Sequence, residues 1–374
     1  MNRRFLFFLG TLALLGVFTG AKAADVFPAH PYVAMMLSLG FIVFFVAWQI
    51  LYRTGALPEE SAGTRALAWM ASVGMGVWAT YLIFAAGVSI VDLVLKGAGL
   101  GAAISALPAL AAASAIIVAI LGLFQAVAVP VVREVSVPVK DLALGLRDLR
   151  IAQISDLHIG PTIRRNQVDR VVDAVLALKP DLIAVTGDMA DGLPERLARH
   201  VEPLSRLRAP LGVYFVTGNH EYYWGAERWM DKIRSLGMTA LLNESRIVER
   251  GGARLLIGGI PDESGGAFVP GHFPDVMRAA ISEGVVDFRL LLAHRPDGVA
   301  AAERAGFDLQ LSGHTHGGQF FPASLFISLF HRFSRGLSRH RSMHVHVNPG
   351  TGYWGPAHRF AVPSEITLLT LEKA

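Results

Sequence analysis

The chain has 374 residues, of which 52% are hydrophobic, and its mean hydropathy of +0.44 is too high for an ordinary soluble domain. It contains no cysteine, which excludes a disulfide framework and a thiolate metal site. The pI is about 9.5, but the formal charge is only +4 and no lysine-rich run carries interleaved aromatic residues, so the composition favours a partner such as the membrane lipid bilayer over nucleic acid.

The first 130 residues are predicted to form an all-α transmembrane region. After Arg3 and Arg4, an apolar run ends near Ala23, and this run is either a cleaved signal peptide or a first membrane helix. The later apolar runs are long enough to cross a bilayer. Asp92 and Lys96 are expected to mark a break after the third run. The region therefore contains three or four spans, over residues 5–20, 32–51, 66–88 and 106–127.

The lysine and arginine residues near the spans predict their orientation. Arginines precede the first span and flank the loop after the second, whereas the two other loops carry one lysine each. This asymmetry places the domain that follows residue 127 in the cytoplasm. If the segment 92–96 is instead a cytoplasmic turn, the domain faces outward. The residues that carry the bias are Arg3, Arg4, Arg53 and Arg65 on one side, Lys22 and Lys96 on the other, and Arg133 and Lys140 after the last span.

From residue 149 onward, predicted strands alternate with predicted helices, which is typical of an α/β domain. Helical periodicity covers residues 166–178, 193–207 and 224–236. Strands are expected over 149–154, 181–186, 212–217, 288–293 and 309–312, a hairpin over 247–249 and 254–258, and closing strands over 343–347 and 365–371.

Five of these strands are followed by side chains of the kind that bind metal ions. The clearest case is His314-Thr315-His316, where glycines let the loop turn sharply and the two imidazoles of an extended H-x-H point the same way. A single aspartate or histidine after a strand is ordinarily a cap or turn residue, but five strands in order are not explained in that way. Oxygen and nitrogen donors favour Mn, Fe, Zn, Mg or Co. The candidates are Asp156, His158, Asp188, Asn219, His220, His294, His314 and His316.

These motifs carry a resemblance to a known family. Asp-x-His, Gly-Asp, Gly-Asn-His-Glu, His and Gly-His-x-His occur in the order found in calcineurin-like metallophosphoesterases, so residues 149–371 resemble that family. The spans before them resemble its membrane-anchored bacterial branch. The resemblance implies an α/β fold, a four-layer sandwich of two mixed β-sheets flanked by helices, for a catalytic domain at residues 131–374. It also implies the bacterial inner membrane for residues 1–130.

The same resemblance implies two divalent metal ions at the strand ends. The first ion would be held by Asp156, His158, Asp188 and His316, and the second by Asp188, Asn219, His294 and His314. One position departs from the family pattern. Many relatives have arginine directly after Gly-Asp, whereas this chain has Met189 there and Asp191 two residues later. The substrate contact that this arginine makes is therefore in doubt.

Charge explains the chemistry that such a site would perform. Two metal ions about 3.5–4 Å apart would neutralise the phosphate and lower the pKa of a bridging water, which gives hydroxide at neutral pH. A bridging ligand needs two oxygens, as Asp188 has. The predicted catalytic residues are His220, which protonates the leaving group, and Asp156, which orients His220 unless Glu221 does so. Alternatively, His220 only makes a hydrogen bond behind the metal ligands.

The segment 320–343 begins beside the histidine pair and combines an apolar run with a basic one. Its apolar part, residues 320–330, and the arginines that follow suit a membrane surface and an anionic lipid headgroup. The alternative is a core strand followed by a solvated loop. Arg335, Arg339 and Trp354 are predicted to bind substrate, and His358 is expected to line the same entrance as Trp354.

Three functions are compatible with these observations. The first is a metal-dependent phosphoesterase that hydrolyses a phosphate ester or pyrophosphate bond in a lipid-linked or membrane-presented substrate. The second is a membrane-tethered phosphodiesterase of soluble nucleotides. The third is a non-enzymatic, metal-stabilised scaffold, which would not need a general acid such as His220. The basic and apolar segment 320–343 favours the first function over the second.

Overall fold

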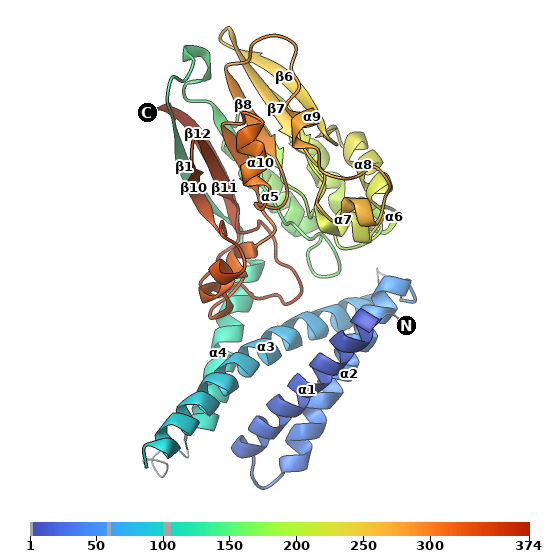
Figure 1. The fold of residues 1–374 in the computed structure, drawn as a ribbon. Coiled ribbons are helices and arrows are strands. Elements are labelled where there is room, and N and C mark those ends of the chain that lie inside the picture. Colours follow the sequence, from blue (N-terminus) through green and yellow to red (C-terminus); the bar gives the residue numbers. More distant parts are fainter. Residues whose placement is uncertain (1–2, 58–60, 100–105) are drawn as a thin grey trace. The chain divides into compact units, whose positions relative to one another are not determined.

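A computed structural model describes residues 3–57, 61–99 and 106–374 of the chain (Figure 1). These residues form two compact units. The helical unit contains the chain up to residue 124 together with residues 355–360, and the sheet unit contains residues 125–354 and 361–374. The predicted domain boundary at residue 130 lies close to the point where the chain first passes from one unit to the other.

Four apolar helices make up most of the helical unit, as the hydrophobic runs predict. Each is long and apolar enough to cross a membrane. The third helix does not break where Asp92 and Lys96 were expected to break it. The two side chains lie one turn apart and form an ion pair of 2.8 Å, so their charges are paired without leaving the helix. The helices are α1 (Arg3–Val26), α2 (Pro31–Thr54), α3 (Ala62–Gly97) and α4 (Leu107–Val127).

A short segment from late in the chain, residues 355–360, belongs to the helical unit. The Ser72 hydroxyl of α3 donates to the Gly355 carbonyl at 3.0 Å and accepts from the Ala357 N–H at 2.8 Å. His358 Nε2 lies 3.0 Å from the Thr80 hydroxyl, and its side chain is fully buried. The expectation that His358 lines an active-site entrance is therefore wrong, because its imidazole is enclosed among these helices.

The sheet unit is the expected sandwich of two mixed sheets flanked by helices. The first sheet has the order β1 (Val131–Val139), β12 (Glu365–Lys373), β2 (Arg150–Ile154), β3 (Leu182–Val185), β4 (Val213–Phe215) and β5 (Thr239–Ala240). The second has the order β10 (Gly336–His340), β11 (Met343–Val347), β9 (Leu309–Ser312), β8 (Phe288–Leu292), β7 (Ala253–Gly259) and β6 (Glu244–Arg250).

The main core lies between the two sheets. Ile151, Leu182 and Leu369 of the first sheet join Leu290 and Leu311 of the second in one buried apolar cluster. Strands buried on both faces have nearly continuous apolar sequences, which is why they can be predicted from the sequence. A second cluster lies under the helices that cover the second sheet. The helices are α5 (Arg165–Ala177), α6 (Pro194–Val201), α7 (Asn219–Tyr223), α8 (Ala226–Ser235), α9 (Val276–Ala279) and α10 (Val299–Arg304).

The predicted helix over 193–207 is shorter than expected. The α-helix α6 ends at Val201, and a 3₁₀ turn continues to Arg206. Pro203 lies in that turn and has no N–H to donate to an α-helical hydrogen bond, which explains the change. The 3₁₀ turns are η2 (Leu144–Leu146), η3 (Glu202–Arg206), η4 (Gly265–Ala267), η5 (His316–Gly318), η6 (Ala323–Leu325) and η7 (Ile327–Leu329).

The topology brings five loops to one edge of the sandwich. In the first sheet β2, β3 and β4 are parallel neighbours, and in the second sheet β8 and β9 are parallel neighbours. The carboxyl ends of parallel strands lie at the same edge of a sheet, where ligands bind in open α/β folds. The predicted ligands follow these five strands.

Candidate metal centre

The structure gathers the predicted ligands into compact groups. Asp156, His158 and His316 have ligand atoms within 4.8 Å of one another, and so do Asp188, His294 and His314. These groups match the two ligand sets that the resemblance implies, apart from the bridging role of Asp188 and the contribution of Asn219. A third group of this kind contains His158, Asp191 and His220.

Asp188 lies at the centre of the site. Its Oδ2 is 3.2 Å from His294 Nε2 and 3.9 Å from Nε2 of both His158 and His220. Its Oδ1 accepts the backbone N–H of His220 at 2.8 Å. One carboxylate oxygen is thus surrounded by imidazoles of both ligand groups, which is the position that a bridging ligand needs.

Several histidine nitrogens lie close together in pairs, an arrangement that would suit coordination of a shared cation. His158 Nε2 lies 3.1 Å from His316 Nε2, and His314 Nδ1 lies 3.2 Å from His294 Nε2. His294 Nδ1 lies 2.8 Å from the Thr186 carbonyl, so a neutral His294 donates there and turns the lone pair of Nε2 into the site.

Asn219 supplies an independent test of whether the site fits metal ions. Its Oδ1 atom is buried and has no hydrogen-bond partner. A buried acceptor without a partner costs free energy, whereas an amide oxygen is an ordinary ligand of a hard divalent cation. The residues present therefore fit the metal ions that the family uses.

The backbone of the ligand loops is strained. Five of the seven predicted ligands have positive φ values in the left-handed region. Such a conformation costs on the order of 1–3 kcal/mol per residue and persists only where the surrounding structure enforces it. It turns the side chains inward at the strand ends. The values are 52° for Asp156, 49° for His158, 51° for Asp188, 70° for His314 and 50° for His316.

Two glycines allow the loops to approach closely. Gly187 has φ of 87°, and a Cβ atom there would lie 2.6 Å from the Gly218 nitrogen. A Cβ atom on Gly313 would overlap the side chains of Ser155 and Asp156. Larger residues at these positions would push the loops after β2, β3, β4 and β9 apart, because a Cβ atom does not fit.

Asp191, rather than Asp156 or Glu221, orients His220. Its two carboxylate oxygens contact Nδ1 of His220 and, at 3.2 Å, Nδ1 of His158. Asp156 instead accepts the His314 N–H, at 3.1 Å from each oxygen. Glu221 accepts three backbone N–H groups, those of Asp188, Met189 and Gly218, at 2.7–3.0 Å. The signal for Asp191 was present in the sequence, since it follows the same strand as Asp188.

The carboxylates determine the protonation of the site in the absence of cations. Burial opposes the charged form of His220, but Asp191 and Asp188 outweigh it and raise its pKa to about 9. In the same way Asp188 outweighs burial and raises the pKa of His294 to about 10. Burial, with the charge of His294, lowers the pKa of His314 to about 3. His220 therefore holds a proton at neutral pH and can act as an acid.

Exposed aromatic rings flank His220. The Tyr223 ring centroid is 5.2 Å from that of His220, and the Trp354 centroid is 5.8 Å away. Tyr223 is 47% exposed and Trp354 is 53% exposed. Gln319 holds Trp354 through two backbone hydrogen bonds, accepting its N–H at 2.9 Å and donating to its carbonyl at 2.8 Å. The predicted substrate-binding residue Trp354 thus lies at the site, and Gln319 is a positioning residue that sequence reasoning missed.

The segment 320–330 is not a core strand. It forms the 3₁₀ turns η6 and η7, and four of its apolar side chains are 53–78% exposed. The stretch that follows this segment is attached to the histidine loop, because the Thr315 hydroxyl donates to the Ser334 carbonyl at 2.6 Å. We call this set of exposed side chains the apolar rim, and it consists of Leu325, Phe326, Leu329 and Phe330.

The two predicted arginines lie at different ends of one strand. Arg335 precedes β10, packs near Gly317 of the histidine loop and has Nη2 3.6 Å from Glu365. Arg339 lies three residues beyond Gly336 along β10, about 10 Å from the end of the strand nearest the site. Its Nε donates to the Arg341 carbonyl at 2.8 Å. The structure therefore brings Arg335, but not Arg339, to the other predicted site residues.

Comparison with known proteins agrees with this fold and site. A model of the calcineurin-like phosphoesterase family matches residues 149–318. An uncharacterized metallophosphoesterase from Aquifex aeolicus is 31% identical over 227 residues, which cover 60% of this chain and 85% of that protein. The chain belongs to the calcineurin-like metallophosphoesterase family.

A vertebrate protein is also similar. A "transmembrane protein with metallophosphoesterase domain" from Danio rerio is 40% identical over 270 residues, which cover 69% of this chain and 61% of that protein. A protein of the same description from Bos taurus is 36% identical over 278 residues, 71% of this chain and 63% of that protein. The chain thus spans about three fifths of the length of these relatives. Together with the four apolar helices, they support integration of this chain in a membrane.

Proposed function

We propose that this protein is a membrane-integrated phosphoesterase that hydrolyses a phosphate ester or pyrophosphate bond in a lipid-linked or membrane-presented substrate. The observation that carries the proposal is the apolar rim, whose four exposed side chains follow directly on the metal-binding histidine loop. Exposed apolar clusters of this kind mark surfaces that contact protein or lipid.

Two divalent ions (Mn, Fe, Zn, Mg or Co) are the proposed cofactors. The position of Asp188 between the two ligand groups supports a pair of ions over a single one. When bound, such ions neutralise phosphate charge and lower the pKa of water. The proposed ligands are Asp156, His158, Asp188 and His316 for one ion, and Asp188, Asn219, His294 and His314 for the other.

His220 is the proposed proton donor. Its Nδ1 is held by Asp191, which leaves Nε2 directed toward the oxygen of Asp188 at 3.9 Å and hence toward the centre of the site. The imidazolium can pass the Nε2 proton to the oxygen of the leaving group as the ester bond breaks. Asp156 is proposed to position the histidine loop, because it accepts the backbone N–H of His314 and lies 3.4 Å from His316 Nε2.

The exposed rings beside His220 favour an alternative, a membrane-tethered phosphodiesterase of soluble nucleotides. Tyr223 and Trp354 present faces on which a nucleobase can stack. A non-enzymatic scaffold is less well supported, because a scaffold has no need of the Asp191–His220 pair. Arg335 is the proposed anion contact in either enzyme, in place of the arginine that Met189 replaces. For Arg339 we propose only a contact with lipid headgroups, at a distance from the metal ions.

The experiment compares substrates on the full-length chain with defined Mn or Zn. Changing Phe326 and Phe330 to serine should slow hydrolysis of a lipid-linked pyrophosphate at least tenfold while sparing a soluble aryl phosphodiester. The matched control changes Ile281 and Val285, which are 67% and 84% exposed and precede β8 at the opposite edge of the sheet, to serine. If the two variants behave alike, or if nucleotides are the better substrates of the unchanged protein, the lipid-substrate proposal is wrong.

A further inference from the structure

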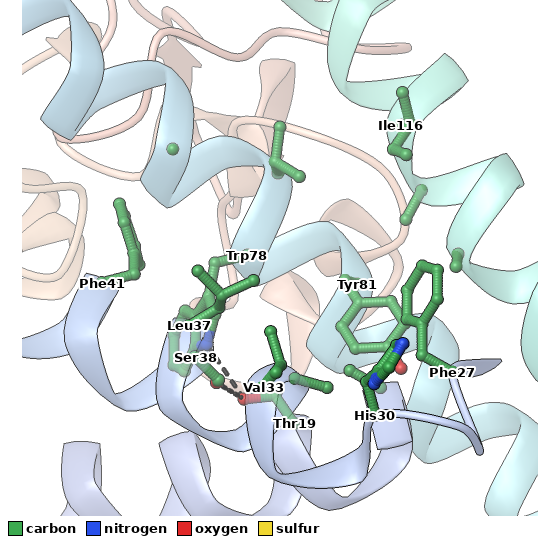
Figure 2. Close-up of a pocket in the computed structure, with 16 residues that line it drawn as sticks. Thr19, Phe27, His30, Val33, Leu37, Ser38, Phe41, Trp78, Tyr81 and Ile116 are labelled. Carbon is green, nitrogen blue, oxygen red and sulfur yellow. Dashed lines mark hydrogen bonds between the residues drawn. The ribbon is translucent and has the colours of Figure 1, made fainter. Parts of the chain in front are cut away.

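The helical unit contains a cavity of about 640 Å³ to which all four helices contribute (Figure 2). Pockets that enclose one small ligand have volumes of roughly 300–1,000 Å³. Small residues at Ala34, Gly74, Ala112 and Ala115 help to line the space. Gly74 also lets the Phe41 ring of α2 pack closely against α3, because a Cβ atom there would overlap that ring.

Three polar side chains in the wall of this cavity, those of Thr19, Ser38 and Trp78, already have partners. Trp78 Nε1 donates to the Thr19 hydroxyl at 3.1 Å, and the Thr19 hydroxyl lies 2.7 Å from that of Ser38 (Figure 2). The Ser38 hydroxyl also donates to the Gly16 carbonyl at 3.0 Å. An occupant of the cavity therefore meets apolar side chains and these satisfied groups over most of the wall, and the polar groups of His30 and Tyr81 besides. A hydrocarbon chain fits this surface, and a polar ligand would lose its own hydrogen bonds on entering.

A second cavity, of about 370 Å³, shares Tyr81 with the first and is lined partly by charged side chains. Lys22 and Asp25 at the end of α1 lie 3.5 Å apart, and Asp92 and Lys96 at the end of α3 form the ion pair of 2.8 Å. These charges lie at the ends of apolar helices, where lipid headgroups and water meet the hydrocarbon of the bilayer. The apolar cavity thus adjoins the charged one, just as the acyl chains of a phospholipid adjoin its headgroup.

We propose that the two cavities form one binding site for a zwitterionic phospholipid of the phosphatidylethanolamine type. An acyl chain fills the apolar cavity past Tyr81, the phosphate contacts Lys22 and Lys96, and the ammonium contacts Asp25 and Asp92. The balance of charge favours a zwitterionic headgroup, because the wall carries two lysines and two carboxylates. A purely anionic headgroup would meet both carboxylates, and an uncharged one could not replace the ion pairs that these four side chains form with each other. The site does not depend on the phosphoesterase reaction.

The test is lipid binding to the delipidated full-length protein in detergent, followed by native mass spectrometry. Phosphatidylethanolamine should bind about tenfold more tightly than phosphatidylglycerol with the same acyl chains. Ala112→Phe, which fills the cavity, should weaken phosphatidylethanolamine at least tenfold. The matched control Ala113→Phe, at an exposed neighbouring position of α4 that does not line the cavity, should leave binding unchanged. Equal binding by these two variants overturns the site.

The headgroup is tested separately. Replacing Asp25 and Asp92 with asparagine should remove the preference for phosphatidylethanolamine, whereas a wild-type preference for phosphatidylglycerol overturns the zwitterionic assignment. If Ala112→Phe fails to fold, a phosphatidylethanolamine with a diazirine on its acyl chain replaces that variant. Crosslinks should then map to residues around Tyr81, Trp78 and Phe27, and crosslinks spread over the outer faces of the helices would refute the site.

Discussion

Asp191→Asn should convert His220 from an imidazolium to a neutral imidazole at the pH of the reaction. Asp191 is the strongest of the groups that raise the pKa of His220 from 6.5 to about 9. If its loss returns the pKa to 6.5, the protonated fraction at pH 8 falls from about 0.9 to about 0.03, which is a loss of about thirtyfold. Because Asp191 acts on His220 through its negative charge, its loss lowers the pKa of His220 whether or not cations are bound.

The assay is kcat against pH for two aryl phosphodiesters, one with a good and one with a poor leaving group, at saturating metal. Saturation matters because Asp191 also holds His158, and loss of such a partner weakens metal binding. The loss should be large for the poor leaving group, should shrink toward pH 6, and should nearly vanish for the good leaving group, which needs no proton.

A double variant separates this role from a structural one. If Asp191 acts through His220, then adding Asp191→Asn to His220→Ala should cost little more than His220→Ala alone, which is itself expected to lower kcat by roughly 10²–10⁴-fold. Additive losses, or a loss that does not depend on pH and leaving group, would show that Asp191 serves the fold or the metal ions and not proton transfer.

Three further predictions follow from the site and the spans. Asp188→Asn should abolish turnover and reduce bound metal, measured by elemental analysis, and a variant that keeps two metals and near-normal rates contradicts the bridging role. Metal affinity should rise with pH between about 7 and 10, because a bound ion must displace the proton of His294, whose pKa is about 10 without metal. Calorimetry in buffers of different ionisation enthalpy should detect the released proton. An affinity that does not depend on pH would contradict this proton displacement. A fluorescent reporter fused after Ala374 should fluoresce in the cytoplasm, whereas an active alkaline phosphatase fusion there would place the sheet unit outside.

The strands and ligands were predictable because each leaves a local signal. A buried strand such as β2 or β8 is a short, mainly apolar run, and the candidate ligand lies within two residues of its end. Elements without that signal escaped prediction. The edge strand β10 has the sequence Gly336–His340 with only one large apolar residue, and β5 has two residues, so their pairing partners rather than their composition make them strands.

The partners of the predicted catalytic side chains were less predictable than the candidate ligands. Asp191, Glu221 and Asp156 are all carboxylates close in sequence to His220 or the ligand loops, and spacing does not decide which one reaches the imidazole. The choice depends on the left-handed turns at Asp156 and Asp188, which point those carboxylates into the site, and on Glu221 accepting three backbone N–H groups. Only three-dimensional geometry distinguishes these uses of the same side chain.

The loop from Trp354 to Phe360 joins a predicted substrate contact directly to residues of the helical unit. Gln319 fixes Trp354 beside His220, and the chain passes at the next residue into the segment that Ser72 and Thr80 hold through Gly355 and His358. A chain shortened to its sheet unit would expose His358, which is fully buried in the intact protein, and would lose the hydrogen bonds of α3 to this segment. The metal ligands would keep their strands, but one end of the loop that carries Trp354 would lose its attachment. The apolar helix α3 therefore holds the residues that directly follow a predicted substrate contact.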